Sequence, residues 1–288
     1  MKKMMLFAIV ALVMTACNGS SNNKPGDQQP AQVFVAMNPE YVLSNQDGSK
    51  FLLFDYQTEN PEMLNNYEFI FYKGEYYPVV YKGHQDSDPE NDMGSDSYFN
   101  FDYHEGYLFE MKEGKLLTDP EDEYDAIYAS PLLVDKAFKE SVKIVSQDFW
   151  GDNVPQEVEA QLEQQFDRKL VWARTDYKFG ENLEYQFICA QFENKGDQAL
   201  ALIGVVMPDG SLRLKEFPAE WNEYSVWRVD DEGEFNGYWL DLITVENGVL
   251  TLYACNSGAE GSNYQAFVVT DEGLSEGTVA KSFYQAGI

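Results

Sequence analysis

The chain is poor in basic residues, in histidine and in cysteine. Its 288 residues include 20 Lys and Arg against 49 Asp and Glu, with 2 His and 3 Cys. So acidic a surface repels phosphate backbones, and we therefore expect no nucleic-acid binding. It also repels anionic lipid headgroups, so attachment to a membrane must come from another feature of the chain.

The sequence also lacks the common short motifs of catalysis and cofactor binding. His84 and His104 lie in no zinc-binding spacing, and no His-Glu-x-x-His, Cys-x-x-Cys, Gly-x-Ser-x-Gly or phosphate-binding glycine loop occurs. These absences favour a non-catalytic role. An envelope hydrolase is the alternative, and it would need a histidine or two carboxylates to meet in a cleft.

No apolar run reaches the roughly 20 residues that span a bilayer. The run Met4–Ala16 follows two lysines and has the charged start and short apolar core of a secretory signal. It ends in Met14-Thr15-Ala16-Cys17, which resembles the lipobox of bacterial lipoprotein precursors. The resemblance implies that residues 1–16 are removed and that Cys17 is acylated. The alternative is an ordinary signal peptide with a chance cysteine.

The residues after the cysteine refine this expectation. Under the sorting rule of such lipoproteins, Asn18 in place of an aspartate implies the outer membrane. No acid follows before Asp27, so the periplasmic face and the cell surface both stay open. Residues 17–32 are polar and have too little apolar content to fold, which predicts a lipidated cysteine on a flexible tether. Each buried CH₂ of an acyl chain contributes about 0.8 kcal/mol to membrane binding.

The clearest local signal in the remaining chain is a hairpin over Tyr238–Cys255. Two apolar runs flank Asn247-Gly248, the pair favoured in a two-residue type I′ turn. Both faces of the hairpin are apolar, so we expect it in the middle of the fold, covered on both sides. The predicted cross-strand pairs are Glu246 with Val249, Val245 with Leu250, Ile243 with Leu252, and Leu240 with Cys255.

Other turns follow the same pattern. Pro208-Asp209-Gly210 separates the strand-like runs Leu200–Met207 and Ser211–Phe217, as in a type I turn with a bulge. Aromatic-rich segments such as Tyr67–Tyr72 favour pleated, half-buried strands. The predicted fold class is α+β, mostly antiparallel β-sheet with hairpins and one or two helices.

Two segments break the strand pattern. Ser130-Pro131 opens a run with apolar residues at helical spacing, which predicts a helix over about 131–145. Asp152 or Asn153 then caps a second run, predicted to be helical over about 154–169. The apolar residues that recur every fourth position in the second run are Val158, Leu162, Phe166 and Leu170.

Residues 33–288 form one β-rich region that could consist of two related halves. Gly114-Lys115-Leu116 and Glu123-Tyr124 resemble Gly210-Ser211-Leu212 and Glu223-Tyr224, about a hundred residues later. Two such halves would meet near residues 146–152. Chance similarity in a chain rich in Glu, Gly and Tyr is the alternative.

Acid-rich segments are the candidate metal sites. Ca²⁺ binds six to eight oxygens, which alternating acids in a loop can supply. The loop between Gly83 and Ser97 has such acids but not the spacing of an EF-hand, and a solvated loop is the alternative. The run Asp230-Asp231-Glu232 is expected to be an exposed turn. The candidate calcium ligands are Asp86, Asp88, Glu90, Asp92 and Asp96.

The candidate ligand site is an aromatic group after Pro218. Trp221, Tyr224 and Trp227 lie close together in sequence, beside acids and an arginine. Aromatic rings stack on the apolar face of a sugar while polar groups bind its hydroxyls, so a glycan or a peptide is the expected ligand. On a strand, the two tryptophans would share one face. The alternative is that these rings are core.

Cys189 and Cys255 remain after acylation of Cys17. An even pair in an oxidising compartment could form a disulfide. Both lie in apolar, strand-like runs, so two unpaired buried thiols are the alternative. The sequence as a whole predicts a lipid-anchored envelope protein with a binding or assembly role. A purely structural module that binds a protein partner is the alternative.

Overall fold

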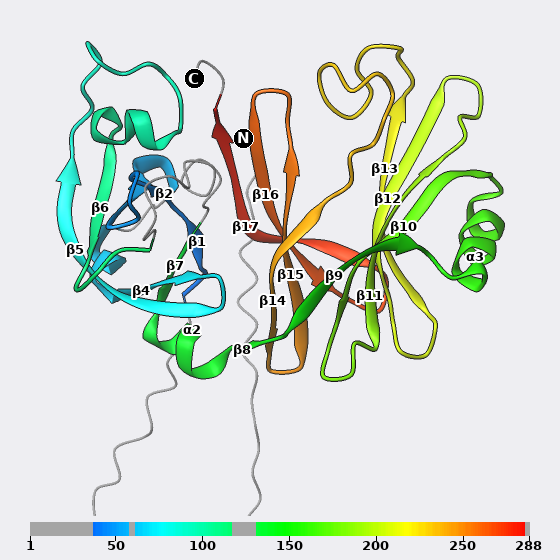
Figure 1. Ribbon diagram of the computed structural model, residues 1–288, viewed down its shortest axis with the longest axis horizontal. Helices are drawn as coiled ribbons and strands as arrows, with labels where there is room; N and C mark the ends of the chain where they lie inside the picture. The colour runs from blue at the N-terminus through cyan, green and yellow to red at the C-terminus, as the bar shows by residue number, and fades with distance from the viewer. Residues whose placement is uncertain (1–36, 58–60, 117–130, 286–288) are drawn as a thin grey trace, which may run out of the picture. The chain divides into compact units, whose positions relative to one another are not determined.

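The computed structural model describes residues 37–57, 61–116 and 131–285, which form three antiparallel β-sheets with a few short helices (Figure 1). This confirms the predicted β-rich α+β class. All of these described residues belong to one compact unit. The signal segment, the tether with Cys17 and most of the first copy of the sequence repeat lie outside the described residues.

The first sheet has seven strands in the order β1-β7-β4-β5-β6-β3-β2. Its two outermost strands, β1 and β2, are separated along the chain by Val42 alone, so the sheet must curl until its two edges are neighbours. The fully buried Phe51, Leu53, Ile70 and Phe109 belong to the core cluster of this sheet. The strands are β1 Glu40–Tyr41, β2 Leu43–Ser44, β3 Lys50–Phe54, β4 Tyr67–Tyr72, β5 Glu75–Gln85, β6 Gly106–Met111 and β7 Leu132–Asp135, with 3-10 helices η1 Asp55–Gln57, η2 Pro61–Asn66 and η3 Tyr98–Tyr103.

The second sheet has five strands in the order β13-β12-β11-β10-β9. It contains the predicted hairpin at Pro208-Asp209-Gly210, where Val206 pairs with Leu212 and Gly210 has φ +82°. β9 is an edge strand, and most of its residues are exposed. The elements are β9 Gln147–Asn153, α3 Gln156–Phe166, β10 Leu170–Phe179, β11 Tyr185–Phe192, β12 Gln198–Val206 and β13 Leu212–Glu220.

The third sheet, in the order β17-β16-β15-β14-β8, contains the Asn247-Gly248 hairpin. Both turn residues have positive φ, +51° and +82°, as the type I′ turn requires. The three predicted pairs nearest the turn are confirmed. Leu240 pairs with Ala254 instead of Cys255, because a bulge at Asp241 shifts the register. The strands are β8 Lys143–Ile144, β14 Trp239–Glu246, β15 Val249–Ser257, β16 Gly261–Val269 and β17 Leu274–Tyr284.

The third sheet has a hydrophobic core on each face. Leu242 and Tyr253 pack with residues of the first sheet, whereas Ile243 and Leu252 pack with residues of the second. The central position predicted for the hairpin is therefore confirmed. The other face of the second sheet packs against α3, whose Leu162 is fully buried. Burial of apolar surface at about 25 cal/mol per Å² in these cores is the main stabilising contribution.

Of the two predicted helices, the second is confirmed and the first is largely wrong. Residues Leu132–Asp135 form β7, because they pair with β4 on one side and β1 on the other. Only Lys136–Ser141 are helical (α2), and Asp135 caps them by accepting the N–H of Phe138. α3 begins after Pro155, and neither predicted cap is used because Asp152 and Asn153 belong to β9.

Strands from both sides of residues 146–152 share the third sheet, since β8 pairs with β14. Residues 147–153 themselves form β9 and pair with β10. The division into two related halves stays a prediction.

Candidate functional site

The predicted aromatic patch does not form one surface. β13 ends at Glu220, and residues 221–238 form an irregular loop in place of the expected strand. Trp221 and Tyr224 are exposed, with 44% and 65% of their surface accessible. Trp227 instead packs against the core between the second and third sheets, and its Nε1 donates to the carbonyl of Phe217 at 2.9 Å. The prediction that the two tryptophans share one face is wrong.

Asp231 is the residue that folds this loop. It is buried, whereas the sequence predicted an exposed turn. Burial is possible because its carboxylate accepts four backbone N–H groups. Burial by itself raises the pKa of Asp231, but these hydrogen bonds outweigh it and hold the pKa below its ordinary value. The donors are Val226 at 2.9 Å, Trp227 at 2.6 Å, Arg228 at 2.9 Å and Gly233 at 3.0 Å.

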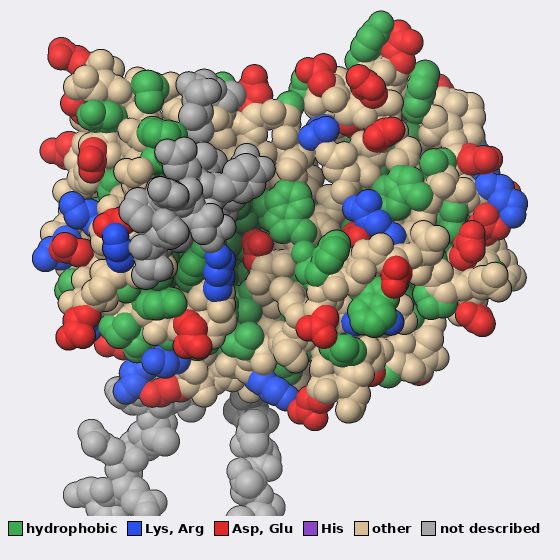
Figure 2. Space-filling model, viewed as in Figure 1, with side chains coloured by type: hydrophobic (Ala, Val, Ile, Leu, Met, Phe, Trp, Pro, Cys, Tyr) green, Lys and Arg blue, Asp and Glu red, His purple; other side chains and the backbone are tan. Residues whose placement is uncertain are grey.

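The end of this loop borders an open groove of about 360 Å³ beside the edge strand β9. On the face that carries β9, Figure 2 shows hydrophobic side chains gathered next to charged ones. Trp239 and Phe149 are exposed, by 38% and 71%, whereas most large apolar side chains of the described chain are buried. The residues that line the groove are Phe149, Gly151, Arg174, Asp176, Tyr177, Asn236, Tyr238 and Trp239.

The polar part of the groove is an arginine–aspartate pair on β10. Arg174 Nε donates to Asp176 Oδ1 at 2.6 Å, and Arg174 Nη2 donates to the carbonyl of Asn236 at 3.2 Å. Asp176 is 5% exposed, and its other oxygen, Oδ2, is buried without a hydrogen-bond partner. A buried carboxylate oxygen with no partner is costly, so a ligand hydroxyl that reached it from the groove would be bound strongly.

The aromatic part of the groove is fixed by ring packing. Tyr177 meets Phe149 edge to face, with 5.6 Å between the ring centroids. Burial raises the pKa of Tyr177 and of Tyr238 to about 12, so both phenols are protonated at neutral pH. One residue further along each strand, the ammonium of Lys178 lies 3.8 Å from the ring centroid of Trp150. The groove therefore offers flat rings beside a charged hydrogen-bonding pair.

The glycine at position 237 allows the loop to approach this pair. Gly237 has φ +77°, and a Cβ there would lie 3.0 Å from Cys189 Sγ and 3.1 Å from Arg174 Nη2. A larger residue would displace the loop from the groove. Sequence reasoning missed the groove because β9, β10 and the loop before β14 are distant in the chain. The available local signal was Arg174 and Asp176, two apart on one strand and therefore on one face.

The five predicted calcium ligands do not converge. Asp88 and Asp92 accept hydrogen bonds within their own loop, and Asp96 accepts the N–H of Tyr284 at 2.9 Å. Asp86 lies beside His84, and Glu90 is exposed. Each loop carboxylate thus points to a different neighbour, and the five do not surround a common position for one calcium ion.

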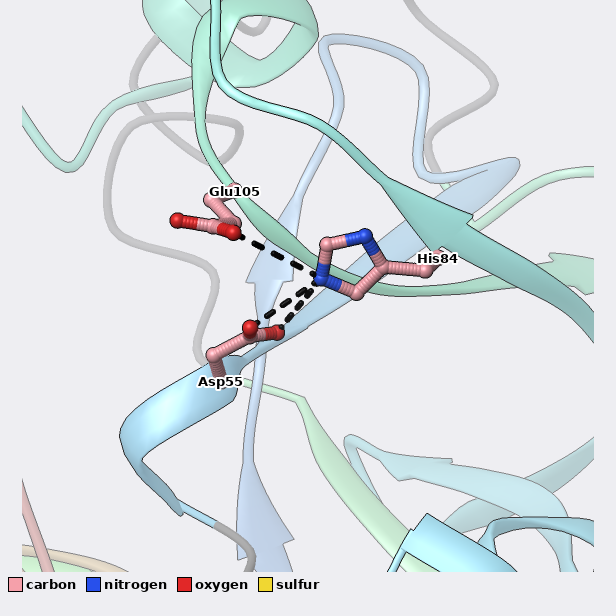
Figure 3. Close-up of side chains that lie close together, drawn as sticks. All are labelled: Asp55, His84 and Glu105. Carbon is pink, nitrogen blue, oxygen red and sulfur yellow. Dashed lines mark hydrogen bonds and ion pairs between the residues drawn. The ribbon is translucent and has the colours of Figure 1, made fainter.

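A different group of metal-binding residue types does come together, on the first sheet. His84 on β5 faces Asp55 of η1 and Glu105 just before β6 (Figure 3). Its Nε2 lies 2.9 Å from Asp55 Oδ1 and 3.8 Å from Glu105 Oε1, and its Nδ1 lies 3.2 Å from Asp86 Oδ1. The hydrogen bond with Asp55 is the main cause that raises the pKa of His84.

His104, the other histidine, is held in place by contacts with neighbouring residues of the protein. Its Nε2 lies 2.8 Å from the carbonyl of Ser95 and 3.5 Å from Asp96, and its ring meets Phe54 edge to face. Neither histidine lines one of the four cavities described here, and the hydrolase alternative stays a prediction.

Cys189 and Cys255 are both free and buried, on β11 and β15. The structure thus has two unpaired thiols, the second of the two expected states, and burial raises the pKa of each. Cys255 packs with the core next to the first sheet and Cys189 with the core next to the second, on opposite faces of the third sheet. This separation accounts for the absence of a bond between them.

Comparison with protein-family models, with curated proteins and with solved structures finds no match for this chain. Among the described residues, every helix is too short or too polar to cross a membrane.

Proposed function

We propose that this protein is a lipid-anchored protein of the bacterial cell envelope that binds a saccharide in the groove between β9, β10 and the start of β14. The observation that carries the proposal is the pairing of Arg174 with the buried carboxylate of Asp176 in a groove lined by exposed rings. The ring of Trp239 would stack on the apolar face of a pyranose. Asp176 and Arg174 would bind its hydroxyls, the first as acceptor and the second as donor.

The acidic composition also supports this ligand class. A neutral saccharide is not repelled by a chain with a formal net charge of −29, whereas a polyanion would be. The groove is open, which suits a chain of sugars more than an enclosed small molecule. Trp221 and Tyr224 do not line this groove, so we place the ligand at the new groove and not at the predicted patch.

The groove is tested by titrating the full chain, purified in detergent, with a panel of neutral oligosaccharides. We expect Trp239→Ala to weaken saccharide binding about 10- to 100-fold, because stacking of an aromatic ring is lost. Asp176→Asn keeps the shape but removes the charge, and should weaken binding about tenfold. Isothermal titration calorimetry gives the affinities.

Trp221→Ala is the matched control, since it removes an exposed tryptophan outside the groove. It should leave the affinity unchanged. Equal losses for Trp221→Ala and Trp239→Ala, or no binding by the wild type across the panel, would contradict a saccharide groove at this position.

The lipid anchor is tested at Cys17. We expect Cys17→Ser to move the protein from the membrane fraction to the soluble fraction and to abolish incorporation of an alkyne-labelled fatty acid. Cys255→Ser is a control that changes a buried cysteine instead. A Cys17→Ser protein that still incorporates the label would refute acylation at this residue.

A further inference from the structure

We propose that Asp55, His84 and Glu105 form a binding site for one divalent first-row transition-metal ion, such as Zn²⁺. One ligand atom from each residue lies within 4.8 Å of the other two (Figure 3). His84 Nε2 lies 2.9 Å from Asp55 Oδ1 and 3.8 Å from Glu105 Oε1, within the roughly 4 Å that two ligands of one ion can span with bonds of about 2 Å. The three residues come from η1, β5 and the turn before β6, so the fold of the first sheet brings them together.

The imidazole of His84 has carboxylates on both sides. Nε2 lies 2.9 Å and 3.1 Å from the two oxygens of Asp55, and Nδ1 lies 3.2 Å from Asp86 Oδ1. A neutral imidazole has one N–H, so it cannot donate on both sides at once. With this N–H at Nδ1, the Nε2 lone pair faces the carboxylates of Asp55 and Glu105.

A metal ion at Nε2 satisfies all of these groups together. Nδ1–H then donates to Asp86, which is the carboxylate–histidine–metal arrangement that orients a metal-binding imidazole. Asp86 is outside the three ligands and fixes the tautomer that directs the Nε2 lone pair towards Asp55 and Glu105. Tyr107 packs edge to face against the same ring, at 5.3 Å, and holds its plane.

The charge balance also favours a dication. Three carboxylates surround one imidazole, and within the described ranges no lysine or arginine forms an ion pair with Asp55, Asp86 or Glu105. The side chain of His84 is 33% exposed, so an ion can reach it.

The donor set also indicates which ions fit. Imidazole nitrogen favours zinc, copper, nickel and cobalt, whereas Ca²⁺ and Mg²⁺ prefer oxygen ligands alone. Three protein ligands leave at least one coordination position for water, as in open zinc sites. The inference is independent of the saccharide groove, which lies on the second and third sheets.

The test is calorimetric titration of the EDTA-treated full chain with ZnCl₂, and with CaCl₂ as the comparison. We expect one equivalent of Zn²⁺ to bind with a dissociation constant in the micromolar range or below, and Ca²⁺ to bind at least 100-fold more weakly. His84→Ala should weaken Zn²⁺ binding by at least 100-fold. Asp86→Asn should weaken it about tenfold, because it changes only the group behind the histidine.

Asp102→Asn, a change of an exposed acid of η3 outside the site, is the control and should leave Zn²⁺ affinity unchanged. Circular dichroism checks that each variant is folded. The proposal fails if wild-type protein gives no saturable Zn²⁺ isotherm, if folded His84→Ala binds Zn²⁺ like the wild type, or if Ca²⁺ binds as tightly as Zn²⁺.

Discussion

Replacing Lys281 by methionine should abolish a rise in stability that the wild-type protein shows above pH 7. Lys281 is only 6% exposed, and burial lowers its pKa to about 7, against the opposing charge of Glu40. Its ammonium lies among three aromatic rings, 4.0 Å from the centroid of Phe54, 4.2 Å from Tyr56 and 5.0 Å from Phe283. It also donates a hydrogen bond to the Tyr56 hydroxyl.

The sign of the effect follows from proton binding. Between pH 7 and the ordinary lysine pKa near 10.5, the unfolded chain keeps the proton that the folded protein has released. Because the unfolded state binds more protons in this window, the free energy of unfolding rises with pH. One pKa unit corresponds to about 1.4 kcal/mol, so the gain between pH 7 and pH 9.5 is on the order of 3 kcal/mol.

The measurement is urea unfolding of wild type and Lys281→Met from pH 6 to pH 9.5. The difference in unfolding free energy, wild type minus variant, should be flat below pH 7 and then increase. Lys112→Met changes an exposed lysine and should give a difference that does not vary with pH. A constant difference for Lys281→Met as well would mean that the buried amine keeps its proton throughout.

Glu40 provides a second control with the opposite sign. Burial raises the pKa of Glu40 from 4.5 to about 7, although a hydrogen bond with Gln57 and the charge of Lys281 oppose the shift. Between these values the folded protein holds the proton that the unfolded chain has lost. The contribution of Glu40 to the free energy of unfolding therefore falls as pH rises. Glu40→Gln should therefore remove a decrease between about pH 4.5 and pH 7, below the window of Lys281.

The third sheet shows how far local patterns determine a fold. The Asn247-Gly248 turn sets the register of the nearest residues, because its two positive φ values determine which residues face each other. The bulge at Asp241, six residues from the turn, then moves Leu240 to the opposite face from Leu242. Nothing in the local alternation marks that bulge, since apolar residues occupy both faces of the strand.

The helix predicted over 131–145 fails for a related reason. Leu132, Leu133 and Val134 are buried on both faces of the sheet, and a continuous apolar run of this length fits either a helix or a central strand. This segment forms a strand because it pairs with β1 and β4, which lie more than sixty residues earlier in the chain. Tertiary contacts thus override the helical spacing that the sequence offers.

The position of a single side chain could be predicted only where strand alternation determines the face on which it lies. On β17, Val279, Lys281 and Phe283 alternate with exposed residues, so period-two bookkeeping would have placed the lysine on the buried face. Asp55 and His84 could not be paired in this way. They are brought together because β3 and β5 both pair with β6. This pairing is non-local, and no pattern in the sequence of either segment predicts it.

Replacing Asp231 by alanine should disorder the loop 221–238 and weaken any ligand binding in the groove. The carboxylate accepts four backbone N–H groups, and no other described side chain takes over these donors. Hydrogen bonds to a charged group contribute about 1.5–3 kcal/mol each, but water can reach part of the opened loop. We therefore expect a net loss of about 3 kcal/mol in the free energy of unfolding, together with a change in Trp227 fluorescence.

Asp231→Asn separates the charge from the shape, because an amide offers one acceptor oxygen in place of two. The pKa of Asp231 is held below its ordinary value, so its contribution is complete above about pH 4 and is lost as pH falls through the folded pKa. Urea unfolding should thus show a large difference between wild type and Asp231→Asn at pH 7 that shrinks towards pH 2.5. Glu234→Ala, an exposed change in the same loop, should have little effect at either pH. If Asp231→Ala unfolds at the same urea concentration as Glu234→Ala, then the four hydrogen bonds do not stabilise the loop, and the groove must be held in place by the packing of Trp227 and Phe235 alone.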